Sequence, residues 1–297
     1  MAFRRVGILS IGEMGYHWAR LLGDHGVEVL TYLTGRSELT RKRAENAGVR
    51  SVPSLARLTL EADLIVSLVV PSAAKRVASK VAKALAKVGR KDFLYLDANA
   101  ISPMTARDIE LGLSQAQAIF IDGSIIGSAV KLNRGTVVYV SGPQAQQIKG
   151  LEQFGFSVRL LGPDTGQASA FKIVYAGLTK GLQGLFVELL IGARRFGLLD
   201  EILRRYDESF PGLPGKVGRG IAALPVHAGR RAEEMGELSR TFRHHGLKAV
   251  MVPASTKVLN SIAALNAGTA SETGTREGDL LETLELFFQR GLLQGKG

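Results

Sequence analysis

The chain has 297 residues, which is long enough for two domains, and 45% of them are hydrophobic, as in an ordinary globular protein. It contains no cysteine, which excludes disulfides, thiolate metal sites and cysteine nucleophiles and favours the reducing cytoplasm. No run of eighteen apolar residues occurs, and the first strand begins too early to leave room for a signal peptide. We therefore expect neither a membrane span nor a membrane partner.

The formal net charge of +11 requires nucleic-acid binding to be considered. The Lys and Arg residues are spread in pairs along the chain, and the few aromatic residues are not interleaved with them. We therefore expect no nucleic-acid partner, and note that a positive field also attracts an anionic small molecule. The five histidines lack the spacing of metal ligands, so no metal site is predicted.

The first forty residues follow the order strand, small-residue turn, helix, strand. Apolar strands are expected over 4–9 and 27–33, with an amphipathic helix between them. The turn is formed by Ser10, Ile11, Gly12, Glu13, Met14 and Gly15. In such a turn Gly12 lets a pyrophosphate approach the helix N-terminus, and Gly15 lets the helix pack against the strand. Ser10 replaces the first glycine of the fingerprint, and a positive φ is energetically less favourable for serine than for glycine. The sequence predicts a dinucleotide site; the alternative is a structural glycine turn.

The end of the second predicted strand decides which nicotinamide dinucleotide is preferred. An acid there hydrogen-bonds the ribose 2′-hydroxyl of NAD, whereas an arginine accommodates the 2′-phosphate of NADP. No acid occurs in the segment, which reads Thr34, Gly35, Arg36, Ser37. Arg36 can form a planar fork to a phosphate, Ser37 can donate a hydrogen bond, and Arg41 lies one helical turn beyond. The sequence predicts NADP rather than NAD; the alternative is that Ser37 only caps a helix over 38–47 and the arginines are solvated.

The first half of the chain alternates strands with helices. A helix closed by Gly89 is expected over 72–88, and further strands over 63–70, 93–97, 118–122, 136–140 and 157–161. This alternation implies a largely parallel sheet covered on both faces. Beyond residue 162 a long helix is expected over about 165–196, followed by helices interrupted at 211–215 and 253. The prediction is an α/β fold: a Rossmann-type, mostly parallel sheet in 1–162 and an all-α domain in 163–297.

Polar residues follow two of the later strands, at the edge where open α/β sheets bind ligands. Asn99 is a candidate cofactor contact, with an Asx turn before the next helix as the alternative. Ser124, Gly127 and Ser128 are candidate substrate contacts, because backbone N–H groups there can bind an anion; the alternative is a plain loop.

The chain resembles the β-hydroxyacid dehydrogenase family, which includes 3-hydroxyisobutyrate dehydrogenase and is related to 6-phosphogluconate dehydrogenase. The resemblance covers nearly the whole chain and is strongest to an uncharacterised branch with Gly-Arg-Ser after the second strand. It rests on the glycine turn, the loop at Val70 and Pro71, and the segments 97–103, 122–128 and 166–176.

The resemblance implies that Lys172 is the general acid/base, that Val70 and Pro71 contact the cofactor, and that the helical domain forms a homodimer. The alternative for Lys172 is a solvated surface lysine. Helical spacing places four substrate-binding candidates on its face, namely Tyr175, Ala176, Thr179 and Lys180.

Two positions depart from the family pattern. Ala176 stands where the family has asparagine, and Ile126 where it has a serine, so polar groups expected near a substrate carboxylate are absent. A substrate larger or less polar than a small hydroxy acid is therefore favoured. Tyr175 or Thr179 can replace the hydrogen bond of the asparagine, and Lys180 can raise the local potential.

From these features we expect an NADP-dependent oxidoreductase that transfers a hydride between the nicotinamide and a hydroxyl/carbonyl substrate. Two alternatives stay open. One is an imine reductase, although relatives with that activity usually lack the lysine. The other is a non-catalytic NADP-binding regulator, which needs the glycine turn but not Lys172. A helix over 226–242 carries His227 and Arg231, either within a solvated or interface helix or as substrate contacts across a dimer.

Overall fold

The computed structural model describes residues 3–265 and 280–293. Their contacts divide the chain into two units, the first ending at Lys172 and the second beginning at Ile173. The first unit extends beyond the predicted boundary at residue 162, because the start of helix α6 (Gln167–Arg195) is hydrogen-bonded to the sheet.

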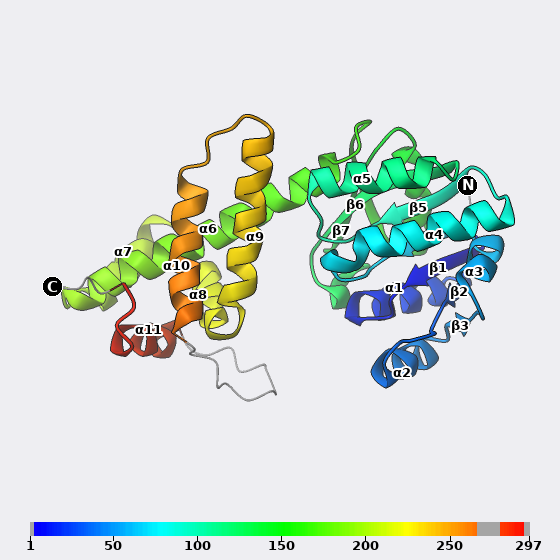
Figure 1. Cartoon of the computed structure of the whole chain (residues 1–297). Helices are drawn as coiled ribbons and strands as arrows, with labels where there is room; N and C mark the ends of the chain where they lie inside the picture. Colours follow the sequence, from blue (N-terminus) through cyan, green and yellow to red (C-terminus); the bar gives the residue numbers. More distant parts are fainter. Residues whose placement is uncertain (1–2, 266–279, 294–297) are drawn as a thin grey trace. The chain divides into compact units, whose positions relative to one another are not determined.

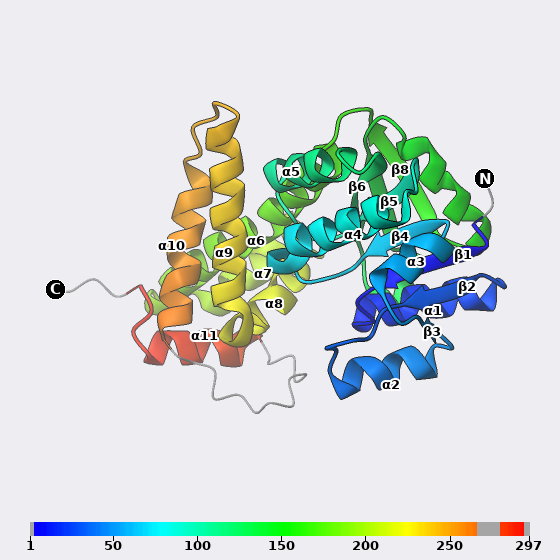
Figure 2. The same cartoon turned by 45° about the vertical axis from the view of Figure 1, so that its right-hand side comes forward.

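An eight-stranded sheet forms the centre of the first unit, in the order β3-β2-β1-β4-β5-β6-β7-β8. Its strands are labelled in Figure 1 or, for β4 and β8, in Figure 2. The strands are β1 (Arg5–Leu9), β2 (Glu28–Thr31), β3 (Arg50–Ser51), β4 (Leu64–Ser67), β5 (Phe93–Asp97), β6 (Ala118–Ile126), β7 (Val137–Ser141) and β8 (Ser157–Gly162). Every neighbouring pair is parallel except β6 with β7. The prediction of a Rossmann-type, mostly parallel sheet followed by a helical region is therefore confirmed.

Helices cover both faces of this sheet. The α-helices are α1 (Glu13–Asp24), α2 (Glu38–Asn46), α3 (Leu55–Glu61), α4 (Ala74–Val88) and α5 (Pro103–Ser114), and the 3₁₀ helices are η1 (Pro71–Ala73), η2 (Ala129–Lys131) and η3 (Ala145–Phe154). Helix α1 and η3 share one buried cluster with the sheet, and α3, α4 and α5 share another with its opposite face. The left-handed Gly89 ends α4, as the sequence predicts.

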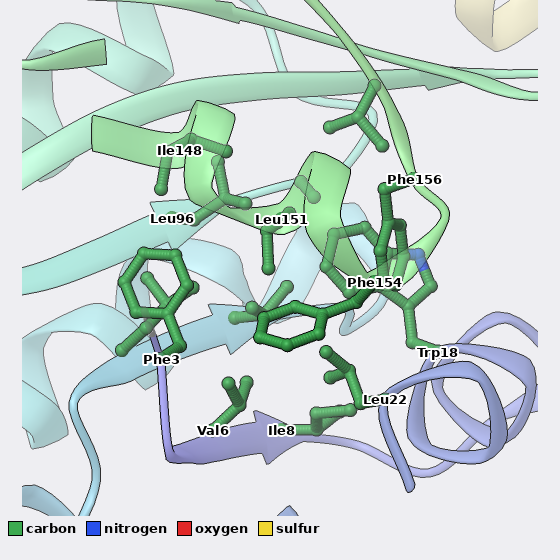
Figure 3. Packing of buried hydrophobic residues seen from close by; sticks show 14 of the residues in the cluster. Phe3, Val6, Ile8, Trp18, Leu22, Leu96, Ile148, Leu151, Phe154 and Phe156 are labelled. Carbon is green, nitrogen blue, oxygen red and sulfur yellow. The ribbon is translucent and has the colours of Figure 1, made fainter. Parts of the chain in front are cut away.

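The cluster under α1 and η3 fixes the helix that follows the glycine turn (Figure 3). Trp18 of α1 is completely buried, and its ring lies 4.5 Å from that of Phe156. Leu22, one turn along α1, is also completely buried, as is Ile8 of β1. Because truncating a buried tryptophan costs about 3–5 kcal/mol, this packing holds the N-terminus of α1 firmly at the end of β1.

The second unit consists of helices. It contains the greater part of α6, followed by α7 (Leu199–Ser209), α8 (Leu213–Ala222), α9 (Leu224–His244), α10 (Met251–Ala264) and α11 (Leu280–Gln289). One apolar cluster joins them, with Val187, Leu190 and Leu259 at its centre. The predicted long helix agrees with α6. Pro253 lies within the first turn of α10 rather than interrupting a helix, which is a position that tolerates proline.

Helix α6 is long and apolar enough to cross a membrane by length and composition, with a mean hydropathy of 1.2. Only 28% of the relevant window is buried. However, Val187 and Leu190 lie in the core of the second unit, and the first turn of α6 is hydrogen-bonded to the sheet. These contacts attach α6 to the folded parts of both units, and the expectations of no membrane span and a cytoplasmic location stay predictions.

Candidate functional site

The turn between β1 and α1 has the backbone that a dinucleotide requires. Ser10 is held at φ 79°, a left-handed conformation that costs a non-glycine residue on the order of 1 kcal/mol. A Cβ on Gly15 would lie 2.2 Å from the Ser10 carbonyl oxygen, so packing requires glycine there. Gly12 is the N-cap of α1, and a Cβ on it would meet only the Ser10 hydroxyl, at 4.0 Å. No close contact among the described residues explains Gly12, and its open position suits a phosphate at the helix N-terminus.

The other predicted turn residues offer their backbone rather than their side chains. Ile11 is completely buried in the core beneath the turn. Glu13 is exposed in the first turn of α1, and Met14 is half-buried and packs on the same core. The α1 N-terminus has no side-chain cap, so its first N–H groups stay available to an anion.

A cavity of about 330 Å³ lies at the ends of β1 and β2, and we call it the cationic cavity. It is lined by Leu9, Tyr32, Thr34, Gly35, Arg36, Leu55, Ala73, Arg76, Val77 and Lys80. Thr34 and Arg36, two of the predicted cofactor contacts, line this cavity, and their role stays a prediction. Arg76 and Lys80 come from α4 and were missed, although their four-residue spacing puts them on one helical face.

Ser37 and Arg41 are engaged nearby and do not line the cationic cavity. The Ser37 hydroxyl accepts a hydrogen bond from the Thr40 N–H and caps α2, which is the alternative considered from the sequence. Arg41 donates through Nε to the Arg36 carbonyl oxygen at 3.3 Å, and this contact supports the backbone of Arg36. Pro71 begins η1, preceded by the exposed Val70.

A row of buried polar residues crosses four strands at the level where β1, β4 and β5 end. Ser67, Asp97, Asp122 and Ser141 are successive partners in the ladders of β4, β5, β6 and β7, and all are completely buried. Leu9, the last residue of β1, is paired with Ser67. This row therefore lies at the sheet edge that also carries the glycine turn, where open α/β sheets place their ligands.

Asp97 has few donors for its charge. Its Oδ1 accepts a hydrogen bond from the Asn99 backbone N–H at 3.0 Å, while its Oδ2 has no hydrogen-bond partner among the described residues. Burial raises the pKa of Asp97 to about 7, against the opposing hydrogen bonds from Asn99. The predicted contact Asn99 donates from its side chain to the Ser67 hydroxyl at 3.0 Å, and its buried Oδ1 is likewise unpartnered there.

Asp122, next to Asp97 in the sheet, has many donors. Its carboxylate accepts hydrogen bonds from the Ser141 and Ser169 hydroxyls and from the Gly166 and Ser169 backbone N–H groups. Burial raises the pKa of Asp122, and these hydrogen bonds oppose the rise. The negative charge of this neighbouring pair is therefore best held on Asp122 and the proton on Asp97.

Lys172 is half-buried in the second turn of α6. Tyr175, about half exposed, follows at i+3 and Ala176 at i+4. The Thr179 hydroxyl donates to the Ala176 carbonyl oxygen at 2.9 Å, so its proton is committed to the helix. Lys180 lies 2.5 Å from a Glu234 carboxylate oxygen. Glu234 is also paired with Arg230, so the three side chains together keep one positive charge, and the expectation that Lys180 raises the local potential stays a prediction.

The predicted substrate loop is different from expectation. Strand β6 continues to Ile126, so Ser124 is a completely buried strand residue paired with Tyr139 rather than part of a loop. The expectation that Ser124 follows the end of the strand was therefore wrong, and its buried hydroxyl has no hydrogen-bond partner among the described residues. Gly127, at φ 134°, and Ser128 follow β6 and are exposed.

In α9, Arg231 is used internally. It donates to the Gln183 side chain and to the Gly220 carbonyl oxygen, each at 2.7 Å. Burial, together with Arg230 and Arg231, lowers the pKa of His227. These contacts bind α6, α8 and α9 together, and they favour a packing role for Arg231.

The residues present fit a nicotinamide dinucleotide. Three observations agree: a helix N-terminus with an open N-cap glycine, a cavity lined by three cations at the end of β2, and buried unpartnered oxygens of Asp97 and Asn99 at the ends of the central strands. They suit, in turn, a pyrophosphate, the adenosine half of the dinucleotide and polar groups further along the ligand.

Comparison with known proteins agrees with this geometry. The family model described as the NAD binding domain of 6-phosphogluconate dehydrogenase matches residues 5–154, and a domain of unknown function, DUF1932, matches residues 193–262. An "Uncharacterized 28.5 kDa protein in 7S RNA 5'region" of Methanothermus fervidus is 30% identical over 264 residues, which cover 87% of this chain and 98% of that protein. The mitochondrial 3-hydroxyisobutyrate dehydrogenase of Bos taurus is 25% identical over 172 residues, covering 58% of this chain and 47% of that enzyme. The match thus spans about half the length of that enzyme.

Solved structures share the fold. A conserved protein of unknown function, described as structurally similar to 3-hydroxyacid dehydrogenases, has a TM-score of 0.74 at 27% identity, covering 89% of this chain and 99% of that one. Mycobacterium tuberculosis 3-hydroxyisobutyrate dehydrogenase with L-serine has a TM-score of 0.74 at 17% identity, covering 97% of this chain and 99% of that one. A Bacillus cereus imine reductase has a TM-score of 0.62 at 15% identity, covering 95% and 98%. The chain therefore belongs to the family of the 6-phosphogluconate dehydrogenase NAD-binding domain, and it is an oxidoreductase of the dehydrogenase/reductase type with an NAD(P)-binding domain.

Proposed function

We propose that the protein is an NADP-dependent oxidoreductase that acts on a hydroxyl/carbonyl pair, with Lys172 as the general acid/base. The observation that carries this proposal is the position of Lys172 in the second turn of a helix whose first turn is hydrogen-bonded to Asp122 and Ser141. Those two residues lie in the polar row at the sheet edge that also carries the glycine turn.

The chemistry needs a proton as well as a hydride. A nicotinamide dinucleotide held by the glycine turn and the cationic cavity would supply the hydride chemistry at the carbon of the substrate. In the direction of reduction, negative charge develops on the carbonyl oxygen, and the Lys172 ammonium stabilises it and donates a proton from Nζ. In the direction of oxidation, neutral Lys172 takes the hydroxyl proton. Tyr175 lies one turn further along α6 and can orient the substrate oxygen.

The choice of NADP rests on the cationic cavity. Arg36, Arg76 and Lys80 surround it, and no acidic residue lines it. A ribose 2′-phosphate carries up to two negative charges, which arginine binds with a fork of parallel hydrogen bonds. NADH offers only a hydroxyl there and leaves these cations without a partner, so the cavity favours the phosphorylated cofactor.

The departures Ala176 and Ile126 support a substrate larger or less polar than a small hydroxy acid. Both are half-buried apolar residues where the related family has polar ones. An apolar wall gains free energy from apolar substrate surface, at about 25 cal/mol per Å².

A substrate panel tests the proposal. Purified protein is offered aldehydes, ketones and cyclic imines with NADPH, and alcohols with NADP⁺, and the absorbance of NADPH is followed. We expect turnover with a carbonyl or alcohol, and Lys172→Ala should lower kcat by about 10² or more while NADPH affinity stays the same. Unchanged turnover in Lys172→Ala would overturn the mechanism, and turnover confined to the imines would establish the alternative, an imine reductase.

The cofactor preference has its own test. Arg36→Ala and Arg76→Ala should each weaken NADPH binding by about 10-fold or more, with little change for NADH, because each removes one charge-assisted contact to the phosphate. The matched control is Arg107→Ala, which removes an arginine outside the lining of the cavity. Equal loss for NADPH and NADH would show that the arginines do not read the 2′-phosphate.

We also propose that the helical unit forms a homodimer. Helix α6 carries an exposed row that we call the apolar stripe: Val174, Leu178, Leu185 and Leu189, each more than 40% exposed. These residues recur at helical spacing on one face, and an apolar groove of about 290 Å³ beside Leu178 continues the stripe toward Met251. Contiguous exposed apolar surface of this kind marks a protein interface, and a second copy of the chain is the partner we propose.

A further inference from the structure

The first turn of α6 is attached to the sheet by one buried carboxylate. Asp122 accepts hydrogen bonds from the Ser169 hydroxyl at 2.6 Å, the Ser169 N–H at 2.9 Å and the Gly166 N–H at 3.1 Å. Its neighbour Ser141 donates to the same carboxylate at 3.1 Å and accepts from the Ala168 N–H at 2.9 Å. Two adjacent sheet residues therefore hold three backbone N–H groups at the start of one helix.

These groups have no partner within the helix itself. The first N–H groups of an α-helix lack intrahelical acceptors, and they carry the positive end of the helix dipole. A carboxylate that accepts several of them is stabilised even where burial disfavours its charge. Asp122 thus supplies an anion of the chain's own at the N-terminus of α6, which is otherwise a site for an external one.

We propose that Asp122 is a positioning residue for Lys172, and that Ser141 and Ser169 complete this function. The inference deepens the proposed function and rests on it. An α-helix advances by a fixed 100° and 1.5 Å for each residue. Once the N–H groups of Ala168 and Ser169 are fixed on the sheet, the direction and height of Lys172, only three residues beyond Ser169, are fixed as well.

A second contact restricts the same turn. The ring of Phe171 lies 4.4 Å from that of Tyr139, which stands two residues before Ser141 in β7. With the sheet bound on both sides of Ala170, the turn that carries Lys172 cannot rotate about the helix axis without breaking buried hydrogen bonds. A misplacement of the reacting group by about 1 Å can cost on the order of 10² in rate, so this restriction matters for catalysis.

The first test needs no substrate. Hydrogen exchange of the backbone amides in residues 166–175 is compared in the full chain for the wild type, Ser169→Ala and Asp122→Asn. We expect exchange in this segment to be at least about 10-fold faster in both variants, with the rest of the sheet unchanged. The matched control is Glu61→Gln, which neutralises another buried carboxylate that binds two arginines and lies on α3. Unchanged exchange in Ser169→Ala and Asp122→Asn would overturn the inference.

The second test uses a double-mutant cycle with the carbonyl substrate found by the panel. Ser169→Ala should lower kcat by about 10-fold and leave the Kd of NADPH within about 2-fold. In a Lys172→Ala background the same change should alter the residual rate by less than about 2-fold, because the residue on which it acts is gone. An equal loss in both backgrounds would show a general structural effect and refute the positioning role.

The two proposals fail in distinguishable ways. If Lys172→Ala leaves turnover unchanged, the proposed function fails, while the exchange experiment still reports whether Asp122 holds the helix. If Lys172→Ala abolishes turnover but Ser169→Ala and Asp122→Asn have wild-type kcat, only the positioning inference fails. Should Asp122→Asn not fold, Ser169→Ala removes a single hydroxyl and still decides between the outcomes.

Discussion

Among single residues, the two glycines of the turn have different roles: one allows α1 to pack against β1, and the other leaves room for a phosphate. Gly15 is required by packing, since any side chain there would meet the Ser10 carbonyl oxygen. Gly12 has open space around it and an ordinary φ of −74°. The local sequence pattern predicts both residues but does not distinguish the glycine required by packing from the glycine that leaves room for the ligand.

Gly12→Ala should therefore lower the free energy of unfolding by no more than about 1 kcal/mol, because alanine is a poorer N-cap than glycine but meets no close contact here. It should weaken NADPH binding by about 10-fold or more, because the new methyl group occupies the phosphate position. Gly15→Ala should instead destabilise the protein by about 2 kcal/mol or more through overpacking. Chemical denaturation and NADPH fluorescence titration measure both quantities. A strong loss of stability in Gly12→Ala would place that glycine in the fold rather than in the ligand site.

Asp97 gives a prediction for pH. Burial raises its pKa to about 7, from an ordinary value of 3.8, so the folded protein keeps a proton that the unfolded chain releases. The unfolded state then binds fewer protons between pH 4 and 7, and the contribution of Asp97 to the free energy of unfolding falls as pH rises through this window.

Asp97→Asn, which cannot ionise, should thus gain stability relative to the wild type between pH 5 and pH 8, by about 3 kcal/mol. Urea denaturation at both pH values measures the difference. Glu61→Gln is a control of opposite sign, because the hydrogen bond from Arg50 lowers the pKa of Glu61 and its contribution is lost only as pH falls below 4.5. If the free energies of unfolding of the wild type and Asp97→Asn differ by the same amount at both pH values, Asp97 is already ionised in the folded protein at pH 5.

At the scale of helices and strands, the regular parts of the first unit could be predicted from the sequence and the short or irregular ones could not. Strands β1, β4 and β5 are mostly apolar, each with one charged or polar residue at an end, and α4 ends at a left-handed glycine, so their patterns are strong. Helix α3 has only seven residues, too few for a clear period. The antiparallel return of β6 into β7 depends on contacts with neighbouring strands, which local pattern does not encode.

The candidate site shows the same division. Arg36 and Lys172 were found from local motifs and from resemblance, respectively. Arg76 and Lys80 were missed because α4 reaches the end of β2 only in the folded chain. The hydrogen bonds of Asp122 to Ser169 join residues 47 positions apart, and no local pattern predicts them.

Two glycines of α6 should respond to alanine with opposite signs. A Cβ on Gly177 would lie 2.3 Å from the buried Leu238 side chain of α9, so Gly177→Ala overpacks this contact. The cost of about 1–3 kcal/mol exceeds the gain in helix propensity of about 1 kcal/mol, and net destabilisation follows. Gly192 has nothing within 4 Å of such a Cβ, and Gly192→Ala should stabilise the protein by up to about 1 kcal/mol. Thermal denaturation of the pair measures both, and equal shifts would contradict the close approach of α6 and α9.

At the scale of the whole molecule, the proposed homodimer depends on the apolar stripe of α6. Leu178, 67% exposed at its centre, should tolerate glutamate in a monomer but not in an apolar interface. Leu178→Glu is therefore expected to shift the mass measured by light scattering from dimer to monomer. Leu111→Glu, a matched change at a 64% exposed leucine of α5, should leave the dimer intact. A wild-type monomer at micromolar concentration, or a dimer that survives Leu178→Glu, would place the interface elsewhere or remove it.

The division between the two units falls inside α6, after Lys172, rather than in a loop. Most multidomain chains offer a flexible joint at which a protease can nick or a genetic engineer can splice, and neighbouring domains can then be exchanged like modules. In this chain, cleavage between residues 172 and 173 would interrupt the continuous helix α6. Chimeras that take the second unit from another protein should therefore keep the whole of α6 from one parent. Natural recombination between related genes is subject to the same constraint.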